Sequence, residues 1–359
     1  MSRILISGQW LWPQYQEACA NALESLGHKV ARFGWYRSFY KMGSNGQPEF
    51  NSVLARMQNR YVTGPLILRI NGDLFKMVRE TNPEIVWLYN DTHIWPETLL
   101  KIRRIVPQAQ LVQYTNDNPW GTAEPRYRWR HFKNSIPNFD VNFGYRISNL
   151  RDFELAGSKK AALLRSYFIP EETYPIEKES VEEEVRSDVV FVGHFENDGR
   201  LTLLSEIAQS GVNLKLFGTG WQDPISRLPA SNPLKRLLPV RPVRGEQYIK
   251  AICGSKIALS FLSKLNMDTY TRRSFELPAM KGFMLSEYTD DLNSLFLEGK
   301  EAEYFRTKDE LMEKIKYYLG RQELIDEIAR KGHERVIRDG HDVTSRMKQF
   351  MEVVNSLRD

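Results

Sequence analysis

Short apolar runs alternate with segments of helical periodicity along most of this chain, and that alternation constrains its fold more than any other feature. The clearest example is residues 188–218, where the apolar runs DVVFV and NLKLF flank a helical stretch at 200–209. A strand, a helix and a second strand within roughly 30 residues form a β-α-β unit, whose strands pair in parallel. The sequence therefore predicts an α/β fold built on mostly parallel, doubly wound sheets.

The same alternation begins at the N-terminus and continues to the end of the chain. The pattern predicts strands at 4–7, 28–34, 84–90, 109–115, 139–145, 163–168, 257–262 and 283–287, and helices at 15–26, 65–81, 96–106, 246–253, 308–320, 322–333 and 344–357. Residues 35–63 are polar and aromatic without a clear period. This segment is longer than ordinary connections, which indicates either a functional excursion or a helix without a readable pattern.

A chain of 359 residues is long enough for two domains. The acidic segment 171–187 has no apparent apolar core positions and predicts a linker. We therefore expect a Rossmann-like domain at 1–170, a second Rossmann-like domain at 188–340, and a C-terminal helix over 341–359 that packs back on the first domain.

The composition is that of a soluble globular protein, with 42% hydrophobic and 26% charged residues. Cys19 and Cys253 lie far apart, and neither has a partner at metal-ligand spacing, so a reducing, cytoplasmic setting is expected. No apolar span is long enough for a transmembrane segment. The net charge of +5 and the pI near 9.0 favour acidic partners such as nucleotide-sugars, nucleic acid or anionic lipid surfaces.

Three turns in the second half follow predicted strands, where open α/β sheets bind their ligands. They are Gly193-His194, Gly218-Thr219-Gly220-Trp221 and the segment from Asp268 to Glu276. The two carboxylates can bind the hydroxyls of a sugar or ribose, and the adjacent Arg272 and Arg273 can bind phosphate. The alternative is a surface helix with solvated charges, beside glycines that form only a flexible turn.

A fourth candidate is the start of the predicted helix at Arg200. The free N–H groups and positive dipole end of a helix suit a diphosphate, and Arg200 would add a fixed cation. The alternative is an exposed surface arginine.

Several stretches together resemble the CgeB-like family of GT-B glycosyltransferases over about residues 188–350. They are DVVFVGHFENDGRLTLL, LKLFGTGW, SKIALSFL, RSFELPAMKGFMLSE and GHERVIRDGHDVTSR. The Arg-x-Phe-Glu-x-Pro-Ala motif of the family corresponds to Arg273, Phe275, Glu276, Pro278 and Ala279, and its late His-x-x-x-x-Arg to His341 and Arg346.

The resemblance implies two doubly wound, Rossmann-like domains that face each other across a cleft, with the donor in the second and the acceptor in the first. In the wider retaining group, two glutamates separated by seven residues hold the donor. Asp268 and Glu276 have this spacing. Glu276 then resembles the ribose-binding residue and Asp268 the sugar-binding one, although Asp268 is one methylene shorter than the glutamate of the pattern.

A retaining enzyme of this type needs no protein nucleophile, whereas an inverting enzyme needs a general base. Asp91 and Asp117, each just after a predicted strand, are the base candidates, with His93 a weaker one. The alternative for each aspartate is a helix N-cap or an Asx turn. The chain has no Asp-x-Asp and no His or Cys cluster, so neither a metal nor another cofactor is expected.

The sequence thus predicts a metal-independent glycosyltransferase, with a slight preference for retention, that moves a sugar from a nucleotide-diphosphate donor such as a UDP-sugar to an acceptor hydroxyl. The acceptor is a saccharide, a lipid-linked glycan, a protein or a nucleic acid. Two alternatives stay open: a nucleotide-sugar epimerase on the same fold, and a non-catalytic nucleotide- or nucleic-acid-binding protein. The identities of sugar, base and acceptor and the oligomeric state also stay open.

Overall fold

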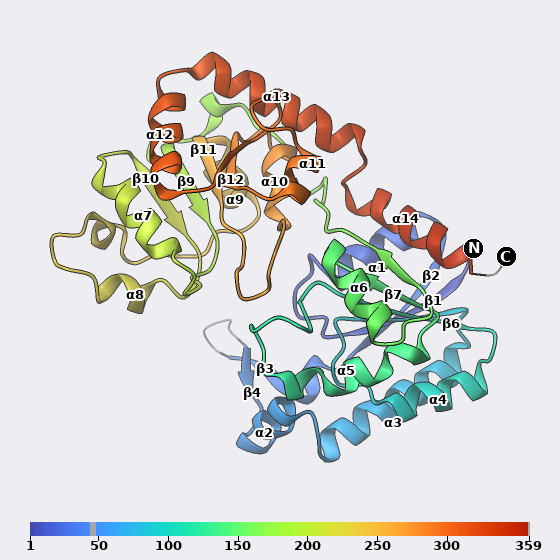
Figure 1. The fold of residues 1–359 in the computed structure, drawn as a ribbon. Helices are drawn as coiled ribbons and strands as arrows, with labels where there is room; N and C mark the ends of the chain where they lie inside the picture. Colours follow the sequence, from blue (N-terminus) through green and yellow to red (C-terminus); the bar gives the residue numbers. More distant parts are fainter. Residues whose placement is uncertain (44–47, 358–359) are drawn as a thin grey trace. The chain divides into compact units, whose positions relative to one another are not determined.

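The computed structural model describes residues 1–43 and 48–357. The chain forms two compact units, unit 1 from Met1–Ser166 with Val343–Asp359, and unit 2 from Tyr167–Asp342 (Figure 1). The segment 171–187 is therefore part of unit 2. It contributes a buried residue, Val181, which is 2% exposed, so the absence of core positions inferred from its acidic sequence was wrong.

Unit 1 is built on a six-stranded parallel sheet in the order β2-β1-β5-β6-β7-β8. Its strands are β1 (Arg3–Gly8), β2 (Lys29–Gly34), β5 (Ile85–Tyr89), β6 (Gln110–Thr115), β7 (Val141–Gly144) and β8 (Ala161–Leu163). Its α-helices are α1 (Gln16–Ser25), α2 (Val53–Tyr61), α3 (Pro65–Thr81), α4 (Pro96–Ile105), α5 (Arg130–Ser135), α6 (Ile147–Leu155) and α14 (Val343–Asn355).

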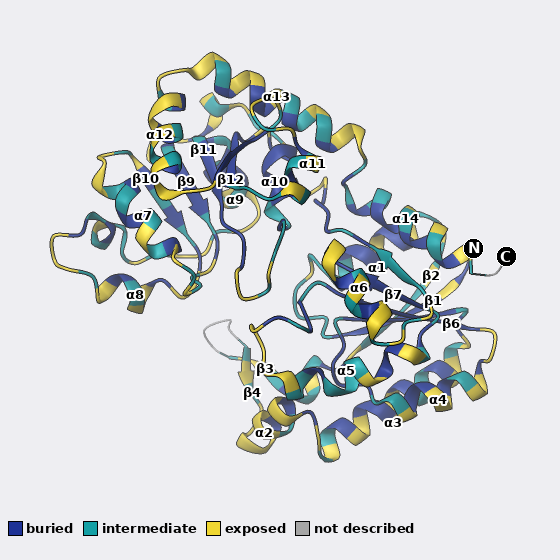
Figure 2. Ribbon diagram, viewed as in Figure 1, coloured by how far each residue is buried: buried dark blue, intermediate teal, exposed yellow. Residues whose placement is uncertain are grey.

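The central strands β5 and β6 are buried along their whole length, and Figure 2 shows β6 among the dark blue strands of unit 1. Strands covered by helices on both faces often read as continuous apolar runs, as β5 does with IVWLY, whereas β6 buries Gln110, Gln113 and Thr115 among its apolar residues. The strand expected at 163–168 was misplaced, because β8 ends at Leu163 and pairs with β7 through Ala161–Leu163.

The C-terminal helix α14 contacts α1 and completes the core of unit 1. The ring of Phe350 stacks on Trp87, with 4.3 Å between ring centroids. Gln110 Nε2 donates to the carbonyl of Val354 (2.7 Å), and Arg346 Nε donates to that of Ser166 (3.1 Å). Arg346 therefore helps to fix the end of the chain within unit 1.

The segment 35–63, which has no clear sequence period, forms regular elements in its described part. β3 (Tyr40–Met42) pairs antiparallel with β4 (Pro48–Phe50), and α2 follows after the cap Ser52, whose hydroxyl accepts from Ala55 N. The remainder of the expected excursion, residues 44–47, lies outside the described residues.

Unit 2 is built on a five-stranded parallel sheet in the order β10-β9-β11-β12-β13. Its strands are β9 (Ser187–Val192), β10 (Leu214–Phe217), β11 (Ser255–Ser260), β12 (Met284–Glu287) and β13 (Glu303–Phe305). Its α-helices are α7 (Arg200–Gln209), α8 (Gln222–Ser226), α9 (Glu246–Cys253), α10 (Arg273–Ala279), α11 (Asp290–Leu295), α12 (Lys308–Leu319) and α13 (Gln322–Arg338).

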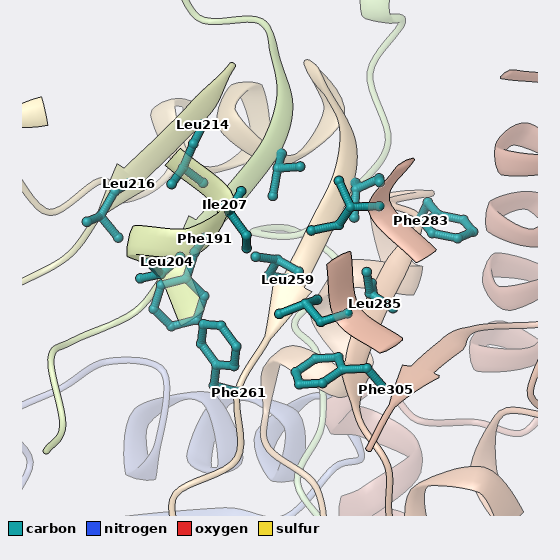
Figure 3. Packing of buried hydrophobic residues seen from close by; sticks show 14 of the residues in the cluster. Phe191, Leu204, Ile207, Leu214, Leu216, Leu259, Phe261, Phe283, Leu285 and Phe305 are labelled. Carbon is teal, nitrogen blue, oxygen red and sulfur yellow. The ribbon is translucent and has the colours of Figure 1, made fainter. Parts of the chain in front are cut away.

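Apolar side chains from the sheet and from α7 and α12 form the core of unit 2. Phe191, Leu259 and Leu285 come from neighbouring strands and lie together with Leu204 of α7 in Figure 3. Each is at most 1% exposed. This packing fixes the positions of the strand ends, from which the candidate site is built.

Candidate functional site

The candidate site lies at the edge of the unit 2 sheet where β9, β10, β11 and β12 end. Because these strands are parallel neighbours, the segments that follow them lie along one edge. The structure places all the donor-binding residues predicted from the sequence in or beside these segments. The surroundings of these residues differ. Some bond only to other residues of this edge and stabilise it, whereas others keep polar atoms that a ligand can reach.

Two glycines let the turns after β9 and β10 approach closely. A Cβ atom on Gly218 would lie 1.9 Å from the carbonyl oxygen of Gly193, and the φ of Gly218 is +144°, which side-chain-bearing residues rarely adopt. A Cβ atom on Gly193 would lie 2.7 Å from the ring of Phe191. Gly220 also has a positive φ of +81°. The backbone of the Gly218–Gly220 turn therefore requires glycine at both positions.

Trp221 secures the same turn from inside. Its indole N–H donates to the carbonyl of Gly193 (2.8 Å), and the residue is only 1% exposed. Its predicted contact with the donor was therefore misplaced, because a tryptophan that follows a glycine turn can equally be an anchor in the core.

Glu276 is a buried carboxylate, 5% exposed, held by two neighbours. Arg272 Nε donates to Oε1 (2.5 Å), and the hydroxyl of Tyr248 on α9 donates to Oε2 (3.0 Å). Burial, followed by the charge of Glu276, raises the pKa of Tyr248 well above its usual value, so Tyr248 remains a donor. These bonds fix the carboxylate and leave acceptor lone pairs for ligand hydroxyls.

Arg273, the first residue of α10, differs from its neighbour Arg272. Its Nε atom is buried without a hydrogen-bond partner, and within the described part of the chain its guanidinium has no carboxylate partner. The guanidinium carbon lies 5.9 Å from the centre of the Phe191 ring, and 3.5 Å from where a Cβ atom on Gly193 would be. A cation that is partly buried and unpaired beside a glycine turn is suited to bind an anion.

Arg200 has a different role from the predicted diphosphate contact. It is 2% exposed and forms a bidentate pair with Asp198, with Nε–Oδ1 and Nη2–Oδ2 distances of 2.8 and 2.6 Å. Its Nη1 atom donates to the carbonyl of His194 (2.8 Å). Asp198 also accepts from the backbone N–H of Arg200 at the start of α7 (3.2 Å), so a carboxylate already occupies this helix end.

The loops after β9 and β11 are joined through Glu196. His194 is largely exposed, and its Nε2 atom lies 2.8 Å from Glu196 Oε1, while Ser263 donates to Oε2 (2.7 Å). Burial alone would raise the pKa of Glu196, but the bonds from His194 and Ser263 and the charge of Arg200 lower it to about 2. Glu196 is therefore a charged connector between the two loops.

Asp268 lies in the loop between β11 and α10 and is partly exposed. Its backbone N–H donates to the carbonyl of Ser263 (2.9 Å), which closes a compact turn. The short helix α10 then carries Glu276, and Pro278 lies in its last turn.

His341 is a core residue of unit 2. It is 5% exposed, and its ring centroid lies 4.7 Å from that of Phe275. Its backbone carbonyl accepts from Phe168 N (3.1 Å), which links the beginning and end of unit 2.

In unit 1, Asp91 and Asp117 follow the neighbouring strands β5 and β6. Asp91 is 2% exposed and accepts hydrogen bonds from Ser7 Oγ (2.5 Å) and His93 N (3.1 Å). Burial raises its pKa to about 6.

Asp117 is partly exposed and accepts a hydrogen bond from Asn90 Nδ2 (2.9 Å). His93 is buried against Trp35, and burial lowers its pKa well below the usual value. Of the three, Asp117 is the accessible one.

Tyr248 and Glu196 are the site residues that the sequence did not single out. Tyr248 comes from a helix predicted at its observed bounds, but no spacing connects it to Glu276, 28 residues later. Glu196 is one of many charged loop residues in the sequence. No cluster of three or more His, Cys, Asp or Glu side chains suited to a metal occurs within residues 1–43 and 48–357.

Comparison with known proteins supports a glycosyltransferase. Residues 200–352 match the model of the family described as Glycosyl transferase-like. That segment contains α7, Arg272, Arg273 and Glu276, but it is less than half of the chain. The finer CgeB-like assignment stays a prediction. None of the curated proteins matches the chain.

Solved structures with the same fold cover the whole chain. Sucrose-phosphate synthase of Thermosynechococcus elongatus has a TM-score of 0.68 at 12% identity and covers 99% of both chains. Anabaena HepE in complex with UDP and glucose has a TM-score of 0.68 at 14% identity, over 99% of this chain and 100% of that one. α,α-Trehalose 6-phosphate synthase of Burkholderia multivorans has a TM-score of 0.65 at 10% identity, with 99% and 97% covered. The fold is thus GT-B, as expected from the sequence.

Over the part of the chain that the structure describes, no helix has the length and apolar character needed to cross a membrane.

Proposed function

We propose that this protein is a glycosyltransferase that takes a sugar from a nucleotide-diphosphate donor, such as a UDP-sugar, and attaches it to an acceptor hydroxyl. The GT-B fold, the family match over 200–352 and the grouping of Glu276 and Arg273 at one sheet edge support this proposal. HepE, which shares the fold, is a protein whose structure contains UDP and glucose.

The unpaired side chain of Arg273 is the observation that supports the proposal most strongly. An arginine that is partly buried without a carboxylate partner costs desolvation energy, which a bound anion would offset. The lack of a side chain on Gly193 lets the Phe191 ring and the Arg273 guanidinium approach the backbone closely, at 2.7 and 3.5 Å from where a Cβ atom would be. We assign Arg273 to the diphosphate, Glu276 to the ribose hydroxyls and Asp268 to the donor sugar.

The proposed reaction retains the configuration of the sugar and does not depend on a metal. The acceptor hydroxyl attacks from the side of the leaving group, while Arg273 stabilises the charge that develops on the departing diphosphate. The bond from the anomeric carbon to the diphosphate breaks, the bond to the acceptor oxygen forms, and the acceptor proton passes to the diphosphate. Unit 1 would bind the acceptor. If the reaction inverts instead, Asp117 is the better base candidate, because Asp91 is engaged with Ser7.

The test is calorimetric titration of UDP, GDP, ADP and CDP, and of their sugar conjugates, into the wild type and Arg273→Gln. We expect one diphosphate to bind, and the variant to lose at least about tenfold in affinity with little change in Tm, since an Arg–phosphate contact is charge-assisted. Arg306→Gln is the matched control. Arg306 follows β13 at the same sheet edge but is already paired with Glu298 (2.7 Å).

Three outcomes would overturn the proposal. If no nucleotide binds at millimolar concentration, the donor site does not exist. If a nucleotide-sugar binds and changes its configuration without any acceptor, the protein is an epimerase. Binding without turnover over a broad panel of saccharide, lipid-linked, protein and nucleic-acid acceptors would favour a non-catalytic binding protein.

A further inference from the structure

Helix α2 in unit 1 has an unusual distribution of side chains. Exposed large hydrophobic residues are concentrated there and just beyond it, with Val53 75%, Leu54 69%, Met57 51%, Tyr61 45% and Leu68 62% exposed. Single exposed hydrophobic residues are normal on protein surfaces, but a cluster of them marks a site of interaction.

The periodicity of α2 places these side chains on one face, away from the core. At 100° per residue, Val53, Leu54, Met57 and Tyr61 fall within an arc of about 100°. The buried residues Ala55 and Asn59 lie on the opposite side. The helix is thus amphipathic in the reverse sense, with apolar residues facing outward. Figure 2 shows it as one of the more exposed helices of its unit.

The charges on α2 itself are all of one sign, and the nearest carboxylates along the chain are Glu49 on β4 and Asp73 on α3. Residues 50–72 contain no Asp or Glu, and their charged residues are Arg56, Arg60 and Arg69. All three are exposed, and none is ion-paired within the described ranges of the chain. Arg56 and Arg60 lie one helical turn apart along the border of the apolar face.

We propose that α2, together with the first turn of α3, binds the surface of an anionic lipid bilayer. Aliphatic side chains flanked by arginines are the chemistry of a helix that lies in the lipid interface, where the apolar residues enter the acyl boundary and the cations meet lipid phosphates. Protein partners offer donors as well as acceptors, and a helix whose only charged residues are arginines matches a uniformly anionic partner better. The inference does not depend on the proposed donor site.

The experiment is co-sedimentation of the full chain with vesicles of phosphatidylcholine alone, or with about 30% phosphatidylglycerol. We expect the wild type to bind the anionic vesicles at about 0.05 M NaCl and to lose most binding at about 0.5 M, because salt screens the contact. Arg56→Gln/Arg60→Gln should bind about thirtyfold more weakly, at about fivefold per arginine. Leu54→Gln/Met57→Gln should bind at least about tenfold more weakly, because fewer apolar side chains enter the bilayer.

Leu155→Gln on α6 is the matched control, since Leu155 is a 78% exposed aliphatic residue on another helix of unit 1. It should bind vesicles like the wild type. The proposal is overturned if the wild type ignores anionic vesicles at low salt, or if both double variants bind as well as the wild type. It is also overturned if light scattering shows a dimer that the Leu54→Gln/Met57→Gln variant abolishes, because the face then binds a second copy. Thermal stability of each variant checks that the fold is retained.

Discussion

The hydroxyl of Tyr248 on α9 donates a hydrogen bond of 3.0 Å to Oε2 of Glu276 on α10. Both helices contact β11, so this bond connects the carboxylate that we assign to ribose with the helix that precedes the strand. Since Arg272 holds the other oxygen, the orientation of Glu276 is determined by the protein before any ligand arrives.

Tyr248→Phe removes that bond without changing the shape of the side chain. Hydrogen bonds to charged groups contribute about 1.5–3 kcal/mol, so we expect the nucleotide affinity to fall by about tenfold or more. Isothermal titration with the nucleotide that binds the wild type measures this. Tyr317→Phe, at an exposed position, is the control. An unchanged affinity in Tyr248→Phe would show that Glu276 does not need this partner.

Gly218→Ala tests the close approach of the turns after β9 and β10. The added Cβ atom would lie 1.9 Å from the carbonyl of Gly193 at a φ of +144°, so the backbone must move. We expect a loss of roughly 3 kcal/mol in the free energy of unfolding, within the range for strained backbone substitutions. Denaturation by urea provides the value.

Gly72→Ala is the contrasting substitution. Gly72 lies within α3, has no atom within 4 Å of an added Cβ, and does not have a positive φ. Alanine should stabilise the protein there by about 0.5–1 kcal/mol, because glycine is a poor helix former. Equal effects of the two substitutions would contradict the interpretation of Gly218.

The position of helix α7 could be predicted from the sequence, but the partner of the Arg200 side chain could not. The bounds of α7 follow from apolar spacing, and the sequence predicted Arg200–Gln209 correctly. Whether Arg200 faces a ligand or Asp198 depends on the path of the loop around Gly199, whose φ is +100°. In the same way, nothing in the sequence distinguishes Arg272 from the adjacent Arg273. Only the positions of Tyr248 and Glu276 in the structure show that Arg272 is the paired arginine and Arg273 the unpaired one.

Asp198→Asn tests the structural role of Arg200. The pair is almost completely buried, with side chains 2% and 3% exposed, so removal of the Asp198 charge leaves the guanidinium with only the longer contact to Glu196 Oε2 (3.5 Å). Such changes cost about 3–5 kcal/mol. Glu334→Gln, in the exposed pair with Arg330, should change the free energy of unfolding by less than about 0.5 kcal/mol. If Asp198→Asn were as mild as Glu334→Gln, the pair would not stabilise the start of α7.

Asp91 predicts a pH dependence of stability in unit 1. Burial raises its pKa in the folded protein to about 6, above the ordinary value of 3.8. The folded state therefore binds the proton more tightly than the unfolded state, and the contribution of Asp91 to stability falls as the pH rises from about 4 to about 6. The difference of roughly two pKa units corresponds to about 3 kcal/mol.

Asp91→Asn removes this titration and keeps a side chain of similar shape. As the pH rises from 4 to 7, the wild type should therefore lose about 2–3 kcal/mol of unfolding free energy relative to the variant. Urea denaturation of both proteins at several pH values measures this difference. Asp73→Asn, on the exposed side of α3, is the control for removal of a surface carboxylate. If the wild type and Asp91→Asn gave parallel curves, Asp91 would already be charged in the folded protein at pH 4. It would then regain its place beside Asp117 as a candidate base.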